Sequence, residues 1–206
     1  MQACLSGVTE SMSRVPLRYQ ATEYDCGCTA VVNAVNYVAD FSSIPAVLLK
    51  VVYDICLNEC NAVGELGAEG TSTEAMRYIA QWMNEDAGKA GCPISCTLLE
   101  GGQVTLRHGS PLVQALQRSC TAAVVLCNLC GDEHYVTLTD VDDEHVLLFD
   151  PYYWPRVYDD RQIVKVNDVF AANRMLPRLF MDTTKGEFYA LPAVDNRLAV
   201  VFEGTM

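Results

Sequence analysis

A cysteine stands at the expected start of a helix in TEYDCGCTAVVNAVNYVA, where apolar residues recur at spacings of one, three and four. This pattern predicts a helix over residues 26–39 that begins at Cys26. The positive end of a helix dipole favours thiolate over thiol, and the thiolate is the nucleophilic form of cysteine. Cys26 is therefore a candidate nucleophile. The alternative is a cysteine that only fills space in the core, which is the common state of this residue type.

The residues around Cys26 suit a substrate site. Gly27 has no Cβ, so the backbone there can approach a ligand closely. We expect Gly27 and its neighbour Asp25 to contact substrate. Gln20 precedes the cysteine by a few residues, and its side-chain amide is a candidate donor to a developing oxyanion, together with the Cys26 N–H.

A base for the thiol is sought among only three histidines. His134 opens an expected strand in HYVTLTDV, and TDVDDEHV reads as the turn of a hairpin. A hairpin folded about that turn brings Asp150 diagonally next to His134 on the same face. One hairpin then presents a base and the carboxylate that orients it, as nucleophilic triads require. The other two histidines, His108 and His145, are expected to be structural or exposed.

The aromatic run DPYYWPRVYDD follows the candidate aspartate directly. Aromatic side chains commonly line ligand clefts, so we expect Tyr152 and Trp154 to contact substrate. Packing of this run as a loop against the helices is the alternative.

These residues resemble the motifs of a known family. The matching motifs are Q-x-x-x-x-D-C-G (Gln20, Asp25, Cys26, Gly27), HYVTL (His134), FDP (Asp150, Pro151), GTS before a helix that contains Trp82, and NR (Asn173, Arg174). They are similar to those of the papain-like peptidases that remove double-glycine leaders from bacteriocins, which form family thirty-nine of the cysteine peptidases. The likeness is closer to stand-alone bacterial relatives of that family, and it covers roughly residues 17–180.

The resemblance implies a cysteine peptidase that needs no cofactor and acts on a peptide or protein. It implies Cys26 as nucleophile, His134 as general base and acid, Asp150 as the group that orients His134, and Gln20 as oxyanion donor. The chain departs from the family at Cys28, where a small residue or proline is usual. It also has no G-x-x-x-x-G-K nucleotide loop, so transport is not expected of it.

Three alternatives stay open. An amine or thiol acceptor in place of water would make the same acyl-enzyme an acyltransferase. A peptide-binding module could keep the fold without turnover. The spacing of CNLC (Cys127, Cys130) suits zinc, with looser pairs in CLNEC and CPISC, but structural zinc needs two converging pairs. We therefore expect no bound metal.

Composition limits the remaining classes. The chain has 206 residues, a length that fits one domain spanning residues 1–206, and its net charge of −12 disfavours nucleic-acid and anionic-membrane partners. No run is long and apolar enough to cross a membrane, and the first residues lack the pattern of a secretory signal. These features predict a cytoplasmic protein whose ten cysteines are reduced and mostly buried. They leave the oligomeric state open.

The order of elements predicts the fold class. Helices are expected over 26–39, after Ser43 and Pro45, from a Thr71–Glu74 capping box to about residue 86, and after Ser110. Short runs rich in valine and leucine follow, typical of strands: TAAVVLCNL, HYVTLTDV, HVLLFD, RQIVKV and LAVVFEG. Helices followed by strands predict an α+β papain-like fold, with N-terminal helices packed on an antiparallel sheet.

Overall fold

Seven antiparallel strands form one sheet in the order β1-β7-β2-β3-β4-β6-β5. The computed structural model describes residues 15–39, 41–154, 158, 160–186 and 188–204. The strands are β1 (Ile94–Glu100), β2 (Thr121–Leu129), β3 (Asp132–Val141), β4 (His145–Phe149), β5 (Val164–Asp168), β6 (Ala172–Pro177) and β7 (Leu198–Gly204). The predicted α+β class with an antiparallel sheet is confirmed.

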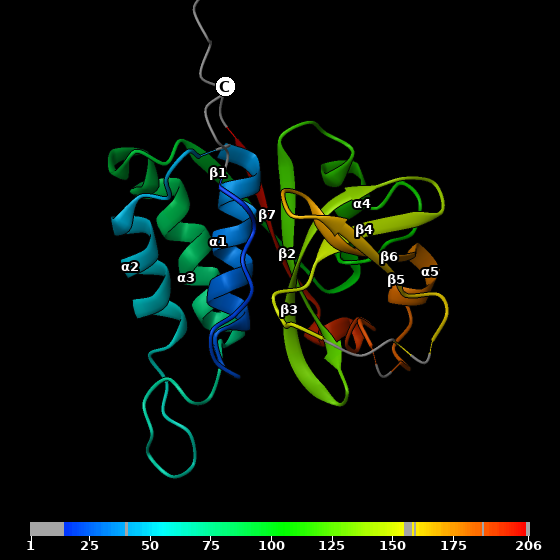
Figure 1. Cartoon of the computed structure of the whole chain (residues 1–206), viewed down its shortest axis with the longest axis horizontal. Coiled ribbons are helices and arrows are strands. Elements are labelled where there is room, and N and C mark those ends of the chain that lie inside the picture. The colour runs from blue at the N-terminus through cyan, green and yellow to red at the C-terminus, as the bar shows by residue number, and fades with distance from the viewer. Residues whose placement is uncertain (1–14, 40, 155–157, 159, 187, 205–206) are drawn as a thin grey trace, which may run out of the picture.

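Three helices form a layer against one side of this sheet (Figure 1). They are α1 (Cys26–Ala39), α2 (Ala46–Cys56) and α3 (Thr73–Glu85). The shorter α4 (Pro111–Leu116) and α5 (Arg178–Met181) lie on the other side, and single 3-10 turns occur at Ala87–Ala90, Gly101–Gln103 and Val194–Asn196. Helix α1 packs on β2 and β3, α3 packs on β1, and α2 contacts both helices, so almost all residues of α1 are buried.

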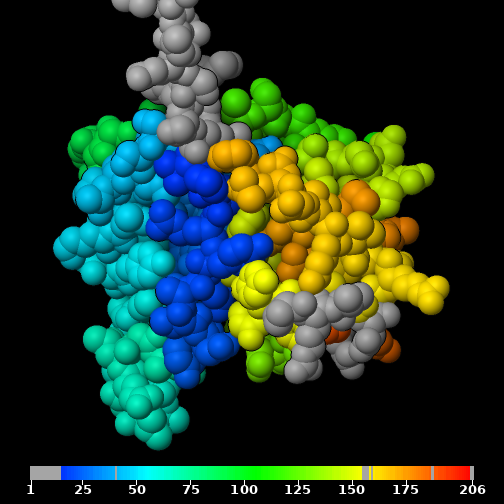
Figure 2. Space-filling model, in the orientation of Figure 1, coloured from blue at the N-terminus to red at the C-terminus, as the bar shows by residue number. Residues whose placement is uncertain are grey.

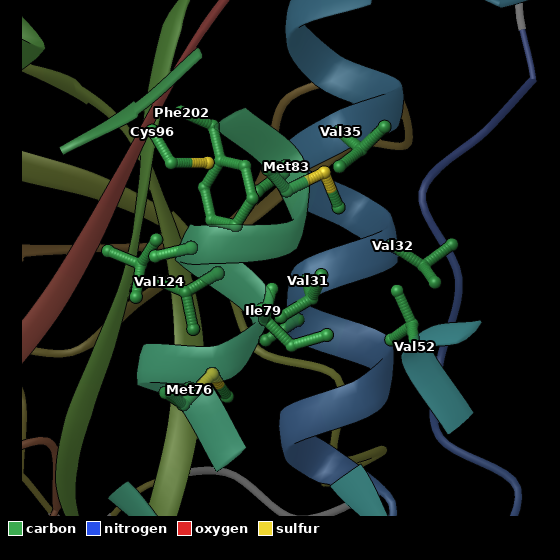
Figure 3. Close-up of a cluster of buried hydrophobic side chains, with 14 of the residues drawn as sticks. Val31, Val32, Val35, Val52, Met76, Ile79, Met83, Cys96, Val124 and Phe202 are labelled. Atoms are coloured by element: carbon green, nitrogen blue, oxygen red, sulfur yellow. The ribbon is translucent and has the colours of Figure 1, made fainter. Parts of the chain in front are cut away.

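Two hydrophobic clusters fill the space between the sheet and the helices on its two sides. Side chains alternate between the faces of a strand, and β2 is buried on both. Its Val124 packs in the cluster under the helical layer, whereas its Val125 packs in the cluster on the α4 side. The first cluster contains Val31 and Val35 of α1, Ile79 of α3 and Phe202 of β7 (Figure 3). The apolar stripe predicted for residues 26–39 is thus the contact surface of α1.

Several expected details differ in the structure. The N-cap of α3 is Ser72, whose Oγ accepts from the Ala75 N–H at 3.2 Å, so the predicted Thr71–Glu74 capping box is wrong by one residue. Pro45 is the N-cap of α2 and no side chain caps that helix, which corrects the expected cap near Ser43. Strands β1 and β6 were not predicted, because their polar residues interrupt the apolar pattern.

The segment over residues 15–25 joins the helical layer to the sheet. Asn33 of α1 accepts from the Arg18 N–H at 2.9 Å and donates back to the Arg18 carbonyl at 2.9 Å. At the other edge of the segment, the Gln20 N–H donates to the Pro151 carbonyl at 2.8 Å. Figure 2 shows this segment, in blue, lying against the yellow residues that follow β4. It therefore carries Gln20 to the place where β4 ends.

Most of the described cysteines are packing residues. Cys28, Cys56, Cys92, Cys96 and Cys127 are buried, whereas Cys60, Cys120 and Cys130 are exposed. Within the described residues, no helix has the length and apolar character needed to cross a membrane. The expectation about a secretory signal concerns residues 1–14, which lie outside the described residues.

Candidate active site

The hairpin of β3 and β4 brings His134 and Asp150 together. Thr137 pairs with Phe149 across the two strands, and β4 ends there, so Asp150 is the first residue after the ladder. His134 Nε2 lies 2.8 Å from Asp150 Oδ1. This contact follows the spacing from which the hairpin was predicted.

The packing of α1 on β3 brings Cys26 near His134. The Thr137 hydroxyl donates to the Ala30 carbonyl at 2.9 Å, which fixes α1 against β3. Ala30 lies one helical turn after Cys26, and Thr137 lies shortly after His134, so this bond brings the start of α1 to the start of β3. His134 is hydrogen-bonded to Asp150, and both His134 and Cys26 line one cavity. Because Nε2 faces Asp150, the ring's other nitrogen, Nδ1, is left for the thiol.

Burial and hydrogen bonding act in opposite directions on His134. Burial of the ring lowers its pKa, but the hydrogen bonds to Asp150 and Cys26 raise it, and the net pKa is about 10. His134 is therefore an imidazolium at neutral pH. This charged ring and Cys26, the first residue of α1, line the same cavity.

Asp150 is fully buried, and every part of it has a hydrogen-bond donor or acceptor. Oδ1 accepts from the Tyr152 N–H at 2.8 Å as well as from His134, and Oδ2 accepts from the Tyr189 hydroxyl at 2.6 Å. The Asn173 side chain bonds the Asp150 N–H and carbonyl, each at 2.8 Å. A buried carboxylate is stable only with such partners. Sequence reasoning missed Tyr189, because it lies far along the chain in a segment without a regular pattern.

Gln20 and Asp25 belong to one tight loop before α1. The Asp25 carboxylate is buried and accepts from the Thr22 N–H and hydroxyl, both at 2.7 Å, and from the Ala21 N–H at 3.2 Å. The Gln20 amide donates to the Thr22 carbonyl at 2.8 Å. A side-chain amide has two N–H groups, so one remains for an oxyanion. Asp25 thus holds the loop that positions Gln20.

A cavity of about 170 Å³ opens beside this cysteine and histidine. It is lined by Gln20, Glu23, Cys26, Leu129, Cys130, Asp132, Glu133, His134, Tyr152 and Trp154. Tyr152 and Trp154 therefore lie where substrate contacts were expected, and the Trp154 ring also stacks on Tyr158 at a centroid distance of 6.0 Å. Asp25 and Gly27 do not line the cavity.

Gly27 has a packing reason to be glycine. A Cβ built on it would lie 2.5 Å from Thr71 Cβ and 2.9 Å from Thr71 Cγ2, closer than real carbon contacts. Thr71, expected to cap α3, instead occupies the space beside the first turn of α1. The close approach that Gly27 permits is to Thr71 rather than to a ligand.

We expect Gly27→Ala to lower both stability and activity. Alanine favours helix by at most about 1 kcal/mol over glycine, whereas overpacking a tight contact costs about 1–3 kcal/mol. The cost of overpacking therefore exceeds the gain in helix propensity, and the clash displaces the residue next to Cys26. A shift of about 1 Å at a reacting group can cost roughly 10²-fold in rate. Thermal unfolding and cleavage assays measure the two effects. The double variant Gly27→Ala/Thr71→Gly should regain most of both, and an unimpaired single variant would contradict the packing argument.

The CNLC pair does not form a metal site in this structure. Cys127 is buried in β2, whereas Cys130 is exposed in the turn before β3 with φ +58°. In the described part of the chain, no group of three or more histidine, cysteine, aspartate or glutamate side chains is arranged to hold a metal ion. The looser pairs in CLNEC and CPISC likewise join one buried to one exposed cysteine or place both in the core.

The fold is similar to that of a cysteine peptidase family. No family model and no curated protein matches the sequence. Among solved structures, a protein described as a C39-like peptidase from Bacillus anthracis matches with a TM-score of 0.53 and 15% sequence identity. The match covers 93% of this chain and 96% of that chain. The relationship predicted from the motifs is therefore confirmed at the level of the fold, which is that of a C39-like peptidase.

Proposed function

We propose that this chain is a cysteine peptidase that cleaves peptide or peptide-like amide bonds through an acyl-enzyme on Cys26. The observation that carries the proposal is that Cys26 at the start of α1 and His134, which is hydrogen-bonded to Asp150, line the same cavity. The C39-like fold supports the same class of activity.

In the first half-reaction, the Cys26 thiolate attacks the carbonyl carbon of the scissile amide. The carbonyl oxygen becomes an oxyanion, and in this proposal the Cys26 N–H and the remaining Gln20 N–H stabilise it. His134 then gives its proton to the leaving nitrogen, the carbon–nitrogen bond breaks, and the amine departs from a thioester on Cys26. Asp150 keeps the His134 ring oriented and stabilises its positive charge.

In the second half-reaction, neutral His134 takes a proton from water as the water oxygen attacks the thioester carbon. The carbon–sulfur bond breaks and the acid product leaves, which restores the thiolate and the imidazolium. An amine acceptor in place of water would give the transferase outcome with the same residues. The mechanism does not define the substrate. The charge of the residues that line the cavity gives information about it.

The cavity walls carry unpaired negative charge. Glu23, Asp132 and Glu133 are exposed, and no ion pair within the described residues involves them. The described residues that line the cavity include no lysine or arginine. A peptide with basic side chains beside the scissile bond would neutralise these carboxylates, whereas an acidic peptide would be repelled.

We expect peptides with lysine or arginine near the cleaved bond to be preferred over otherwise identical peptides with glutamate. Each exposed charge pair is worth about 0.2–1 kcal/mol, so Glu133→Gln should reduce the preference by about 1.4- to fivefold. Paired synthetic peptides, assayed for kcat/KM at low and high salt, measure it. Glu144→Gln, which removes a charge far from the cavity, is the matched control. Equal rates on both peptides would exclude electrostatic selection here.

The test of the proposed function is turnover of a diverse peptide library, read by mass spectrometry. Cleavage that is absent from a Cys26→Ala sample prepared identically supports the peptidase. Peptide ester and thioester probes are applied in parallel, and the adduct is mapped to its cysteine. An adduct on Cys26 without cleavage would indicate that the chain is an acyltransferase rather than a hydrolase. Neither cleavage nor adduct would refute both and leave a peptide-binding module.

A further inference from the structure

Arg174 is a buried cation with no carboxylate at ion-pair distance among the described residues. Its Nε–H donates to the Tyr158 hydroxyl at 2.7 Å, and another N–H donates to the Asn173 carbonyl at 2.8 Å. The guanidinium carbon also lies 5.2 Å from the centroid of the Tyr158 ring. A buried charge is costly unless an opposite charge compensates it. The hydrogen bonds of two tyrosine hydroxyl groups indicate where that compensating charge lies.

Two buried phenols connect Arg174 to Asp150. The Tyr158 and Tyr189 hydroxyl oxygens are 2.6 Å apart, and the Tyr189 hydroxyl lies 2.6 Å from Asp150 Oδ2. An ionised carboxylate only accepts hydrogen bonds, so Tyr189 must donate to Asp150. Its single proton is then used, and its oxygen must accept from Tyr158. Tyr158 in turn accepts from Arg174, so every donor points from the guanidinium toward the carboxylate.

The backbone at Tyr189 holds this geometry in an unfavourable conformation. Tyr189 has φ +60°, a region that is rare for bulky residues and costs of order 1–3 kcal/mol. The end of β2 fixes it there: the Tyr189 N–H donates to the Asn128 carbonyl at 2.6 Å, and the Asn128 N–H donates to the Ala190 carbonyl at 2.8 Å. Such conformations persist where the surrounding structure enforces them, often at functional sites.

We propose that Tyr189 is a positioning residue of the active site, and that it links the Asp150 carboxylate through Tyr158 to Arg174 as the carboxylate's counter-cation. The proposal rests on the proposed roles of Cys26 and His134. It adds Arg174 as a second cation to the series of Cys26, His134 and Asp150. The charges of thiolate, imidazolium, carboxylate and guanidinium then sum to zero inside the protein. Asp150 then stays ionised and fixed, and can hold His134 in its charged form.

Among the described residues that face Asp150 directly, His134 is the only cation. Cys127 of β2 is near, but burial and the Asp150 charge raise the pKa of its thiol, so it stays neutral. Asn173 of β6 and the Tyr152 N–H are neutral donors. Loss of the Tyr189 hydroxyl would therefore leave Oδ2 without its donor and cut the path to Arg174.

The test is Tyr189→Phe, which keeps the ring and removes the hydroxyl. Loss of a hydrogen bond to the charged carboxylate weakens its hold on the His134 imidazolium, so the pH midpoint at which Cys26 becomes reactive should rise by about 1–2 pH units. The apparent pKa of His134 should fall correspondingly. Iodoacetamide alkylation against pH, mapped to Cys26 by mass spectrometry, measures the first. NMR titration measures the second, since only three histidines are present. Neither needs a substrate, so this test can fail independently of the peptidase proposal.

Two further variants keep the outcome decisive. Tyr158→Phe cuts the path one step earlier and should shift both midpoints in the same directions by less, and it carries the test if Tyr189→Phe does not fold. Tyr78→Phe makes the same atomic change at an exposed position of α3 and should shift neither midpoint. A folded Tyr189→Phe or Tyr158→Phe chain with wild-type midpoints would overturn the proposal, even if its stability were lower, because a purely structural role changes stability without moving the midpoints.

Discussion

Replacing Cys26 with alanine is expected to lower cleavage by roughly 10⁴-fold or more, since loss of a nucleophile removes the covalent route altogether. The fold should survive, because the change deletes a single sulfur atom at the start of α1. Steady-state kcat/KM on the best library peptide measures the loss, and thermal unfolding checks the fold.

Cys28→Ala is the matched control for this prediction. It makes the same substitution two residues along the same helix, at a cysteine that is also buried. Its hydrogen bond to Cys56, together with burial, raises the pKa of the Cys28 thiol, so it remains an unreactive thiol at neutral pH. Retained activity in Cys28→Ala and lost activity in Cys26→Ala is the expected pattern. The reverse pattern would move the nucleophile to Cys28 and undo the proposed mechanism.

Asp150→Asn should have the second-largest effect, a loss of up to roughly 10⁴-fold in kcat. Asparagine has the size of aspartate and keeps one oxygen for His134 and the Tyr152 N–H. Its amide nitrogen faces the Tyr189 hydroxyl, which can accept in place of donating. The variant therefore removes the charge with little change of packing. Without that charge His134 loses the carboxylate that raises its pKa, so less of it is protonated at neutral pH.

The same variant gives a measurable change in the pH dependence of stability. In the wild-type chain the pKa of His134 is raised from 6.5 to about 10, so its protonated form stabilises the fold fully below about pH 6.5. That contribution is lost as pH rises through 10. Denaturant unfolding across this range should show a steeper alkaline loss for wild type than for Asp150→Asn. Parallel curves for the two chains would show that Asp150 does not set the charge of His134.

Sequence reasoning located the parts of the site that local patterns encode. The stripe of α1 places Cys26 at a helix start, and the spacing of the β3–β4 hairpin places Asp150 beside His134. It could not locate partners that only the tertiary fold brings close. Tyr189 reaches Asp150 from a distant segment, and the contact between Gly27 and Thr71 depends on how α1 packs beside the residues before α3.

The fold follows the same division between local and distant information. Continuous apolar runs made β2, β3 and β7 predictable, whereas β6 carries Asn173 and Arg174, which are buried because they bond to Asp150 and Tyr158. A buried polar residue reads as a surface residue in a sequence. The residues that sequence patterns treat as solvent-exposed here include those that hold the candidate aspartate.

The strand order has a consequence for when the thiol becomes active during synthesis. Strand β7 follows every other strand in the sequence, yet it lies between β1 and β2. Its Leu198, Val200 and Phe202 complete the core beneath the helical layer. A nascent chain from which Cys26 and His134 have already emerged therefore still lacks the strand that completes the core under α1. We expect α1 to pack firmly on the sheet only after β7 has emerged from the ribosome, so any chemistry that depends on Cys26 and His134 together would begin only then.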